Sequence, residues 1–263
     1  MCLILLAYNS HPRYQLVIAA NRDEFYKRPT RPAAFWPEAP DILAGKDLQE
    51  GGTWMGVTTT GRFAALTNYR DPSRYQPQAP SRGRLVRDYL QSKSSMGPEA
   101  YIESLPAGGE AYNGFNFLLG DGSSLFYYSN REKIVRPVPA GVHGLSNALL
   151  DVPWPKVRRG IKVLTEVLQD DDIKAEQLFD LMTDRELPDD RELPQTGVGL
   201  EKERMLAPTF VTSPDYGTRL TTVILADRQH NIQFWERSFS HREDTWDQVY
   251  YKISGAAGGG KSE

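Results

Sequence analysis

The sequence predicts an α+β fold in which helices cover antiparallel sheets. Three observations lead to this class: strand-like segments lie at both ends of the 263-residue chain, helix-like segments lie between them, and the two kinds do not alternate strictly. A parallel dinucleotide-binding sheet is not expected, because no glycine-rich loop joins a strand to a helix at phosphate-binding spacing. No internal repeat is visible either.

The chain begins with two β-rich segments, 3–8 and 14–21, and the polar turn between them predicts a hairpin. Residues 29–40 follow. They contain four prolines, which exclude a helix. We therefore expect an ordered loop on the surface at this point.

The later elements follow from the spacing of apolar residues and from turn residues. For the first helix we expect Ser81 as the N-cap and 85–90 as the source of the buried face. Helices are expected at 82–92, 98–105, 155–169 and 175–183. Strands are expected at 53–59, 62–69, 115–120, 125–129, 141–147, 219–226, 232–238 and 246–253.

Two long polar segments, 70–82 and 184–208, are expected to connect these elements on the surface. The second of them is either a lid or a solvated loop. A single domain is expected over 1–254, and the glycine-rich residues 255–263 are expected to form a flexible tail.

Composition excludes several classes of protein. The 31 basic and 34 acidic residues give a net charge of −3, which is unlike a nucleic-acid-binding protein. No apolar run is long enough to cross a bilayer, and residues 2–8 lack the basic start and the cleavage site of a secretion signal. The single cysteine cannot form an intramolecular disulfide or a structural zinc site. A soluble, cytoplasmic protein is expected.

Cys2 is the most informative residue. Removal of Met1 would leave a thiol and an α-amino group on one residue, and an amine with a pKa of about 7.7–8.0 accepts the thiol proton near neutral pH. Such a residue is nucleophile and base together. The alternative is that Cys2 packs as a small apolar residue at the start of a buried strand. Position alone does not decide between the two interpretations.

The acid expected near Cys2 is Asp23. In a short hairpin the end of the second strand returns to the start of the first, and this brings the tetrapeptide 21–24 beside Cys2. The alternative is a solvated turn of mixed charges. The apolar run 16–20 before the tetrapeptide and the aromatic residues 25–26 after it favour a packed position.

Six sequence blocks carry a resemblance to a known family. They are Asn-Arg-Asp-Glu-Phe-Tyr (21–26), Glu-Gly-Gly-Thr-Trp-Met-Gly (50–56), Ala-Ala-Leu-Thr-Asn-Tyr (64–69), Tyr-Asn-Gly-Phe-Asn (112–116), Gly-Leu-Ser-Asn-Ala-Leu (144–149) and Tyr-Gly-Thr-Arg (216–219). Together and in this order they resemble the NRDE family, whose animal members are the transport and Golgi organisation protein 2 homologues. The resemblance spans residue 2 to about residue 238.

That family is in turn similar to the N-terminal-nucleophile hydrolases of the cholylglycine hydrolase type. The resemblance therefore implies a four-layer αββα sandwich. It also implies five site residues: Cys2 as nucleophile, Asp23 as the acid that holds its amine, Asn68 in the oxyanion hole, Asn147 steadying amine and substrate, and Arg219 keeping the thiol ionised. Carboxamides donate to an oxyanion without adding charge, and a guanidinium lowers the pKa of a thiol.

One position departs from the pattern of those hydrolases, which carry an arginine three residues before the aspartate. Here Ala20 stands at that position and the arginine is Arg22. Because neighbouring residues on a strand point to opposite faces, Arg22 is not expected to take the role without a twist or bulge. The departure weighs against full hydrolase activity.

Ligand contacts are expected from Asn21, Arg22, Glu24, Trp54, Tyr69 and His143. The aromatic residues Trp54 and Tyr69, with 35–36, would form an apolar slot at the pocket mouth, or else pack as ordinary core. His143 would be an axial ligand if haem were bound, or else makes an ordinary polar contact. The four histidines are too scattered for a zinc site, so no metal is expected.

The resemblance implies two classes of function. In the first, the protein binds and traffics a small amphipathic cargo, either haem or an acyl-CoA or related lipid, and its asparagine and arginine groups hold the carboxylate or phosphate. In the second, it is an N-terminal cysteine amidohydrolase that cleaves a small amide or thioester by acyl transfer through Cys2. No cofactor is required for that catalysis. The sequence does not specify an oligomeric state.

Overall fold

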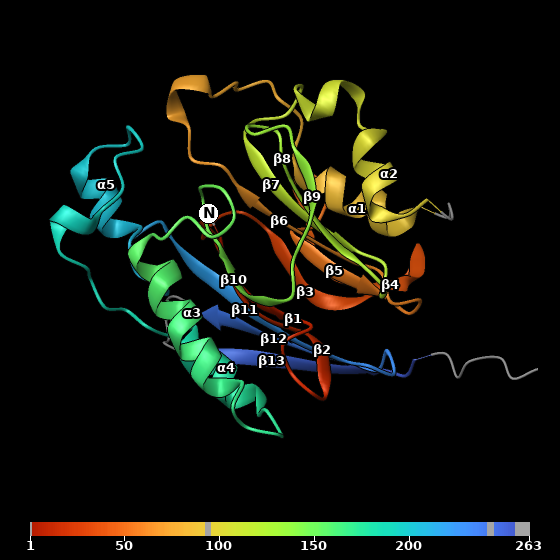
Figure 1. Ribbon diagram of the computed structural model, residues 1–263. Coiled ribbons are helices and arrows are strands. Elements are labelled where there is room, and N and C mark those ends of the chain that lie inside the picture. The colour runs from red at the N-terminus through yellow and green to blue at the C-terminus, as the bar shows by residue number, and fades with distance from the viewer. Residues whose placement is uncertain (1, 93–95, 241–244, 256–263) are drawn as a thin grey trace, which may run out of the picture.

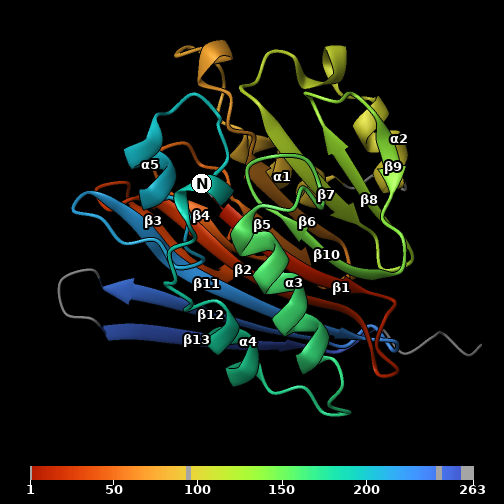
Figure 2. The ribbon, with the colours of Figure 1, turned by 60° about the vertical axis from the view of Figure 1, so that its left-hand side comes forward.

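Two antiparallel sheets stack face to face, and helices cover the outer face of each (Figures 1 and 2). The computed structural model describes residues 2–92, 96–240 and 245–255. Helices α3 (Pro155–Val167) and α4 (Ala175–Leu181) pack on one sheet, and α1 (Gly83–Gln91) and α2 (Pro98–Glu103) pack on the other. The arrangement agrees with the predicted four-layer αββα sandwich.

The six-stranded sheet contains both ends of the described chain. Its strands are, in spatial order, β10 (Gly141–Leu145), β1 (Cys2–Tyr8), β2 (Tyr14–Phe25), β11 (Tyr216–Asp227), β12 (Ile232–Ser240) and β13 (Thr245–Ile253). The seven-stranded sheet follows chain order: β3 (Thr30–Trp36), β4 (Ala39–Asp47), β5 (Met55–Thr58), β6 (Phe63–Asn68), β7 (Phe115–Gly120), β8 (Leu125–Ser129) and β9 (Val135–Pro137). A further helix, α5, spans Leu200–Met205, and short 3-10 turns lie at Pro72–Arg74, Pro106–Gly109 and Asp190–Glu192.

Strand alternation divides the core into layers. In β1, Ile4 and Leu6 pack between the sheets, whereas Leu3 and Leu5 pack under the helices α3 and α4. A third apolar cluster lies between the seven-stranded sheet and α1 and α2. Because side chains alternate with a period of two, Cys2 shares the face of Ile4 and points toward the layer between the sheets.

The hairpin of β7 and β8 has the predicted bounds, and α3 and α4 begin at the predicted residues. The prediction of a loop at 29–40 is wrong, because β3 and β4 occupy this region. Pro32 is tolerated because β3 is an edge strand whose pairing with β4 shifts between Arg31 and Ala34. A residue without an N–H therefore interrupts no regular ladder there.

The structure also differs from the expectations in three smaller ways. Arg82, not Ser81, precedes α1 as its N-cap, and it makes no side-chain cap hydrogen bond. The connection 184–208 contains α5, and the short strand β9 was not expected. The predicted tail lies, except for Gly255, outside the described residues. Among the described residues, none of the helices has the length and apolar character needed to span a membrane.

A buried glutamate links the two sheets. Glu236 on β12 is 1% exposed, and its Oε1 accepts a 2.7 Å hydrogen bond from the N–H of Ala33 on β3. The hydroxyl of Thr222 donates to the other carboxylate oxygen at 3.4 Å. Burial raises the pKa of Glu236 to about 7, although these hydrogen bonds and the charge of Arg22 oppose the shift.

We expect the free energy of unfolding to fall as pH rises from about 5 to 8. The carboxyl of Glu236 titrates near 4.5 when unfolded and near 7 when folded, so the folded state binds more protons in that window. The loss is roughly 3 kcal/mol at 1.36 kcal/mol per pKa unit. Substitution Glu236→Gln removes it, as measured by urea unfolding at several pH values.

The matched control is Glu201→Gln, because Glu201 lies exposed on α5. This variant is expected to keep the pH dependence of the unmodified protein. An equally steep fall in stability in Glu236→Gln would contradict the assignment to Glu236.

Candidate active site

Cys2 begins β1 and lines a cavity at the end of the sandwich. It lies directly opposite Arg22 of β2. Burial raises the pKa of the Cys2 thiol, and the charge of Asp23 adds to this shift. The charge of Arg22 and a hydrogen bond from the backbone of Asp23 act in the opposite direction. The thiol is therefore protonated to a higher pH than an ordinary cysteine.

Arg22, and not its neighbour Asp23, shares the face of Cys2. Residues directly opposite each other on paired strands project to the same side, so Arg22 reaches the side of Cys2 without the expected twist or bulge in the pairing of β1 with β2. Its guanidinium carbon lies 4.4 Å from the centre of the Trp54 ring. Nη1 donates to Thr30 Oγ1 at 3.3 Å, and Nη2 lies 3.8 Å from a carboxylate oxygen of Glu24. An arginine thus stands beside the thiol although Ala20 occupies the position expected for it.

Asp23 lies next to Cys2 through its backbone, and the cavity lining includes it. Its Oδ1 accepts a 2.7 Å hydrogen bond from the hydroxyl of Thr218, and its carbonyl accepts one from Tyr216 at 2.9 Å. Burial raises the pKa of Asp23, while the charge of Lys156 and the Thr218 hydrogen bond oppose this. The Thr218 contact holds the carboxylate on the side of β2 opposite to Arg22.

The two expected asparagines come together from opposite sheets. Asn68 ends β6 and lines the cavity. Asn147 follows β10, and its Nδ2 donates to the carbonyl of Asn68 at 2.8 Å. Asn147 is 1% exposed and lies outside the cavity lining, and its own carbonyl accepts from the N–H of Arg70 at 2.8 Å. Asn147 therefore positions the end of β6, while Asn68 faces the cavity.

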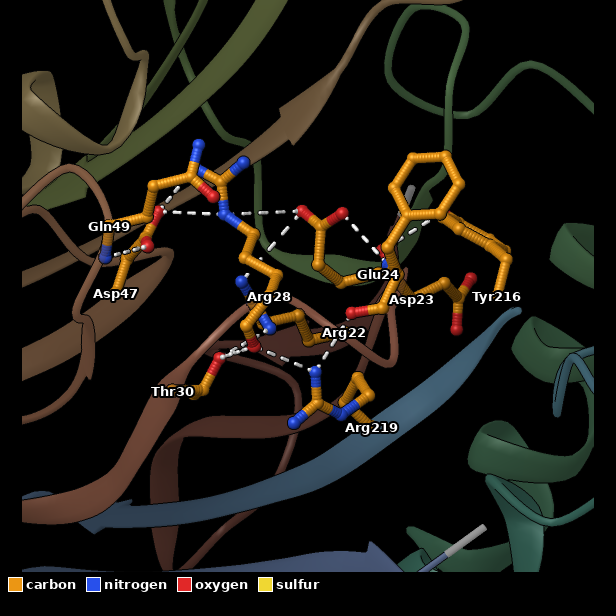
Figure 3. A network of polar contacts seen from close by, with 10 residues as sticks. Arg22, Asp23, Glu24, Arg28, Thr30, Asp47, Gln49, Tyr216 and Arg219 are labelled. Atoms are coloured by element: carbon orange, nitrogen blue, oxygen red, sulfur yellow. Dashed lines mark hydrogen bonds and ion pairs between the residues drawn. The ribbon is translucent and has the colours of Figure 1, made fainter.

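Arg219 contacts the turn after β2. It sits where the pairing of β11 with β2 shifts register, between Thr218 and Leu220. Its Nη1 donates to the carbonyl oxygens of Phe25 and Arg28 at 2.9 and 3.0 Å (Figure 3). Arg219 lies outside the cavity lining. Arg219 therefore holds the turn after β2 in place. The arginine directly opposite Cys2 in the strand pairing is Arg22.

Of the other expected ligand contacts, Glu24 and Trp54 line the cavity along with Arg22. Asn21 and Tyr69 do not. The carboxamide nitrogen of Asn21 donates to the carbonyls of Met182 and Thr209 at 2.8 and 2.9 Å, which ties the sheet to the segments after α4 and α5. Its side chain is therefore engaged on the helix-covered face.

The other aromatic residues and the histidine that were expected near the pocket also lie outside the cavity lining. Phe35 and Trp36 do not line it, and Trp36 packs in the core beneath α1. His143 lies outside the lining, and its Nδ1 and Nε2 lie 2.7 and 3.0 Å from Asp151 Oδ2 and the Pro139 carbonyl oxygen. His241 is outside the described residues. In the described ranges no three His, Cys, Asp or Glu side chains gather as a metal site would require.

The cavity has a volume of about 300 Å³ and includes residues that were not expected to belong to the site. Arg28 donates to one carboxylate oxygen of Asp47 at 3.0 and 2.6 Å, and it also lies 3.8 Å from Glu24 (Figure 3). Arg82 enters from the start of α1, and Tyr75 from the loop before it. Arg28 lies close to the 21–26 block, and this position could have predicted its place in the cavity. The polar segment 70–82 contains no pattern that could have predicted Arg82.

The two stacked sheets and their covering helices form a sandwich of the N-terminal-nucleophile hydrolase type. Among solved structures, the chain is similar to the mutant C2A conjugated bile acid hydrolase from Clostridium perfringens, with a TM-score of 0.50 and 10% identity. The match covers 95% of this chain and 92% of that one. At this identity the likeness concerns the fold.

The family follows from sequence comparison. Residues 1–241 match the model of the Transport and Golgi organisation 2 family. The chain is 37% identical to the Transport and Golgi organization protein 2 homolog of Bos taurus, covering 96% of this chain and 99% of that protein. Identity to the Homo sapiens homolog is 36%, over 97% and 99%. The chain belongs to the Transport and Golgi organisation 2 family.

We expect Arg22→Gln to slow alkylation of Cys2 by iodoacetamide at pH 8. The thiolate is the reactive form, and loss of the Arg22 charge raises the thiol pKa further above its ordinary 9.0. Cys2 is the only cysteine, so the rate reports this thiol alone. The measurement is the alkylation rate as a function of pH, followed by mass spectrometry.

Arg31→Gln serves as the matched control, because Arg31 is an exposed arginine on β3. Its alkylation profile is expected to follow that of the unmodified protein. Coincident profiles for Arg22→Gln and the unmodified protein would rule out the electrostatic role of Arg22.

Proposed function

We propose that this protein binds a small amphipathic ligand with an anionic head in the cavity beside Cys2, and that this ligand is an acyl thioester of the acyl-CoA type. One observation carries the proposal: the arginines 22, 28 and 82 share the cavity with the thiol, in a lining that also contains the carboxylates of residues 23, 24, 47 and 50. Guanidinium groups bind carboxylates and phosphates through paired hydrogen bonds. A ligand held in this way presents its carbonyl group to Cys2.

The contacts of the arginines support an anionic ligand. Arg28 is already paired with Asp47, whereas Arg22 stands too far from Glu24 for a hydrogen bond. Arg82 donates to the carbonyl of Gly114 at 3.0 Å through Nη1. Among the contacts of the described residues, Arg22 and Arg82 thus keep further N–H groups that can donate to a ligand. Arg22 is buried and Arg82 is half-buried, which strengthens their interaction with an anion.

Two observations favour an acyl thioester over haem as the cargo. Charged and polar side chains make up most of the cavity lining, and Trp54 and Tyr75 are its only aromatic members among the described residues. A porphyrin needs a broad apolar slot. His143, the expected axial ligand, keeps both ring nitrogens in hydrogen-bond contact elsewhere.

Hydrolysis through Cys2 is the second candidate, and the place of the thiol beside Arg22, Asn68 and the Asp23 backbone favours it. After removal of Met1, the α-amine accepts the thiol proton and the sulfur bonds to the carbonyl carbon of the thioester. Asn68 donates to the oxyanion. The bond to the leaving thiolate breaks, and that thiolate takes the proton. Water then cleaves the acyl-enzyme, which releases a carboxylic acid and restores the thiol.

We expect octanoyl-CoA to bind in isothermal titration calorimetry, and Arg82→Gln to weaken binding about tenfold, because a charge-assisted hydrogen bond is lost. Cys2→Ala is expected to keep binding. If hydrolysis occurs, protein shown by intact mass to lack Met1 releases free CoA, and Cys2→Ser slows this release by about 100-fold or more.

The control is Arg87→Gln, a substitution on α1 outside the cavity lining. Binding without release of CoA would leave the cargo role and remove hydrolysis. Failure of octanoyl-CoA to bind, together with a Soret shift on titration with haemin, would replace the thioester by haem. Failure of both ligands to bind would overturn the proposed function.

A further inference from the structure

A second cavity lies on the helix-covered face of the six-stranded sheet. Figure 2 shows α4 against this face. Its volume is about 350 Å³, and it is bounded by the end of α4, the segment before β11, and the ends of β12 and β13. Five of the side chains that line it are aromatic: Tyr26, Phe179, Phe210, Phe239 and Trp246. This cavity shares no lining residue with the one beside Cys2.

The aromatic walls are held in fixed arrangements. Phe210 and Phe239 meet edge to face, with ring centres 4.9 Å apart. Arg237 lies between Phe179 and Trp246, with its guanidinium carbon 3.8 and 4.2 Å from their ring centres. Such contacts favour a preformed apolar surface, because the rings pay little further entropy on binding.

The charge of Arg237 is compensated within the protein. Its Nη2 donates to both carboxylate oxygens of Glu176 at 2.6 and 2.7 Å, and its Nε donates to Gln248 at 2.8 Å. Arg237 is therefore a wall of the cavity and not its anion-binding group.

Arg185 is different. Its guanidinium carbon lies 4.4 Å from the centre of the Phe210 ring, and Nη1 donates to the hydroxyl of Thr212 at 3.2 Å. Arg185 makes no ion pair with any described residue, and none of the described residues that line the cavity is acidic. A cation without an ion-pair partner in this part of the chain, at the edge of an aromatic cavity, complements a ligand that is apolar at one end and anionic at the other.

We propose that this cavity binds an amphipathic carboxylate, with the apolar body among the aromatic rings and the carboxylate on Arg185. Its size is in the usual range for small-molecule sites. The site is independent of the proposed thioester function. It is nevertheless close to the other cavity, since Thr218 lines it and donates to Asp23, which lines the first.

The test uses 2-naphthoate, a flat aromatic carboxylate, in isothermal titration calorimetry with the full chain. We expect Arg185→Gln to weaken binding about tenfold, and Arg185→Lys to weaken it less, because the charge is retained. Arg191→Gln is the matched control: Arg191 lies in the same connection, its side chain is 94% exposed, and binding should not change.

A second measurement places the ligand without any change in the cavity. The indole N–H resonance of Trp246, assigned through Trp246→Phe, is expected to shift when naphthoate is added to the unmodified protein. Cys2→Ala is expected to bind naphthoate normally, which separates this site from the proposed function. Equal affinity of Arg185→Gln and the unmodified protein, an unmoved indole signal, or protection of Cys2 from alkylation by naphthoate would each overturn the proposal.

Discussion

The pairing of β2 with a partner on each side sets the geometry of the candidate site. Cys2 lies opposite Arg22 on one side, and Leu220 of β11 lies opposite Arg22 on the other. Ile18 and Ala20, on the same face of β2, are buried between the sheets and hold this register. A slip of one residue would bring the Asp23 side chain to the thiol and turn the guanidinium toward the helices.

Much of the fold could be predicted because its elements keep regular spacing. The hairpin of β7 and β8 and the helices α3 and α4 have clear periodicity and turn residues. The strand β3 could not be found in this way. Its prolines exclude a helix but not an edge strand, and edge position depends on which strands pair, which a local pattern does not contain.

The positions of site residues could be predicted where they follow from the order of the strands along the chain. A tight hairpin must bring Asp23 beside Cys2, and the strand end at Asn68 was visible. The role expected for Arg219 could not be checked from the sequence, because a register shift in β11 directs its side chain to the turn after β2. Arg82 reaches the cavity only through the packing of α1 against the sheet, and no local pattern reports such a contact.

The place of Cys2 on the cavity wall matters for how the protein is prepared. Any peptide fused ahead of Cys2 is joined to a residue that lines the cavity, and it holds the α-amino nitrogen of Cys2 in an amide bond. A tag joined beyond Ile253, where β13 ends at the edge of the six-stranded sheet, leaves the cavity open. The two positions of a tag therefore differ in how near to the cavity the added peptide begins.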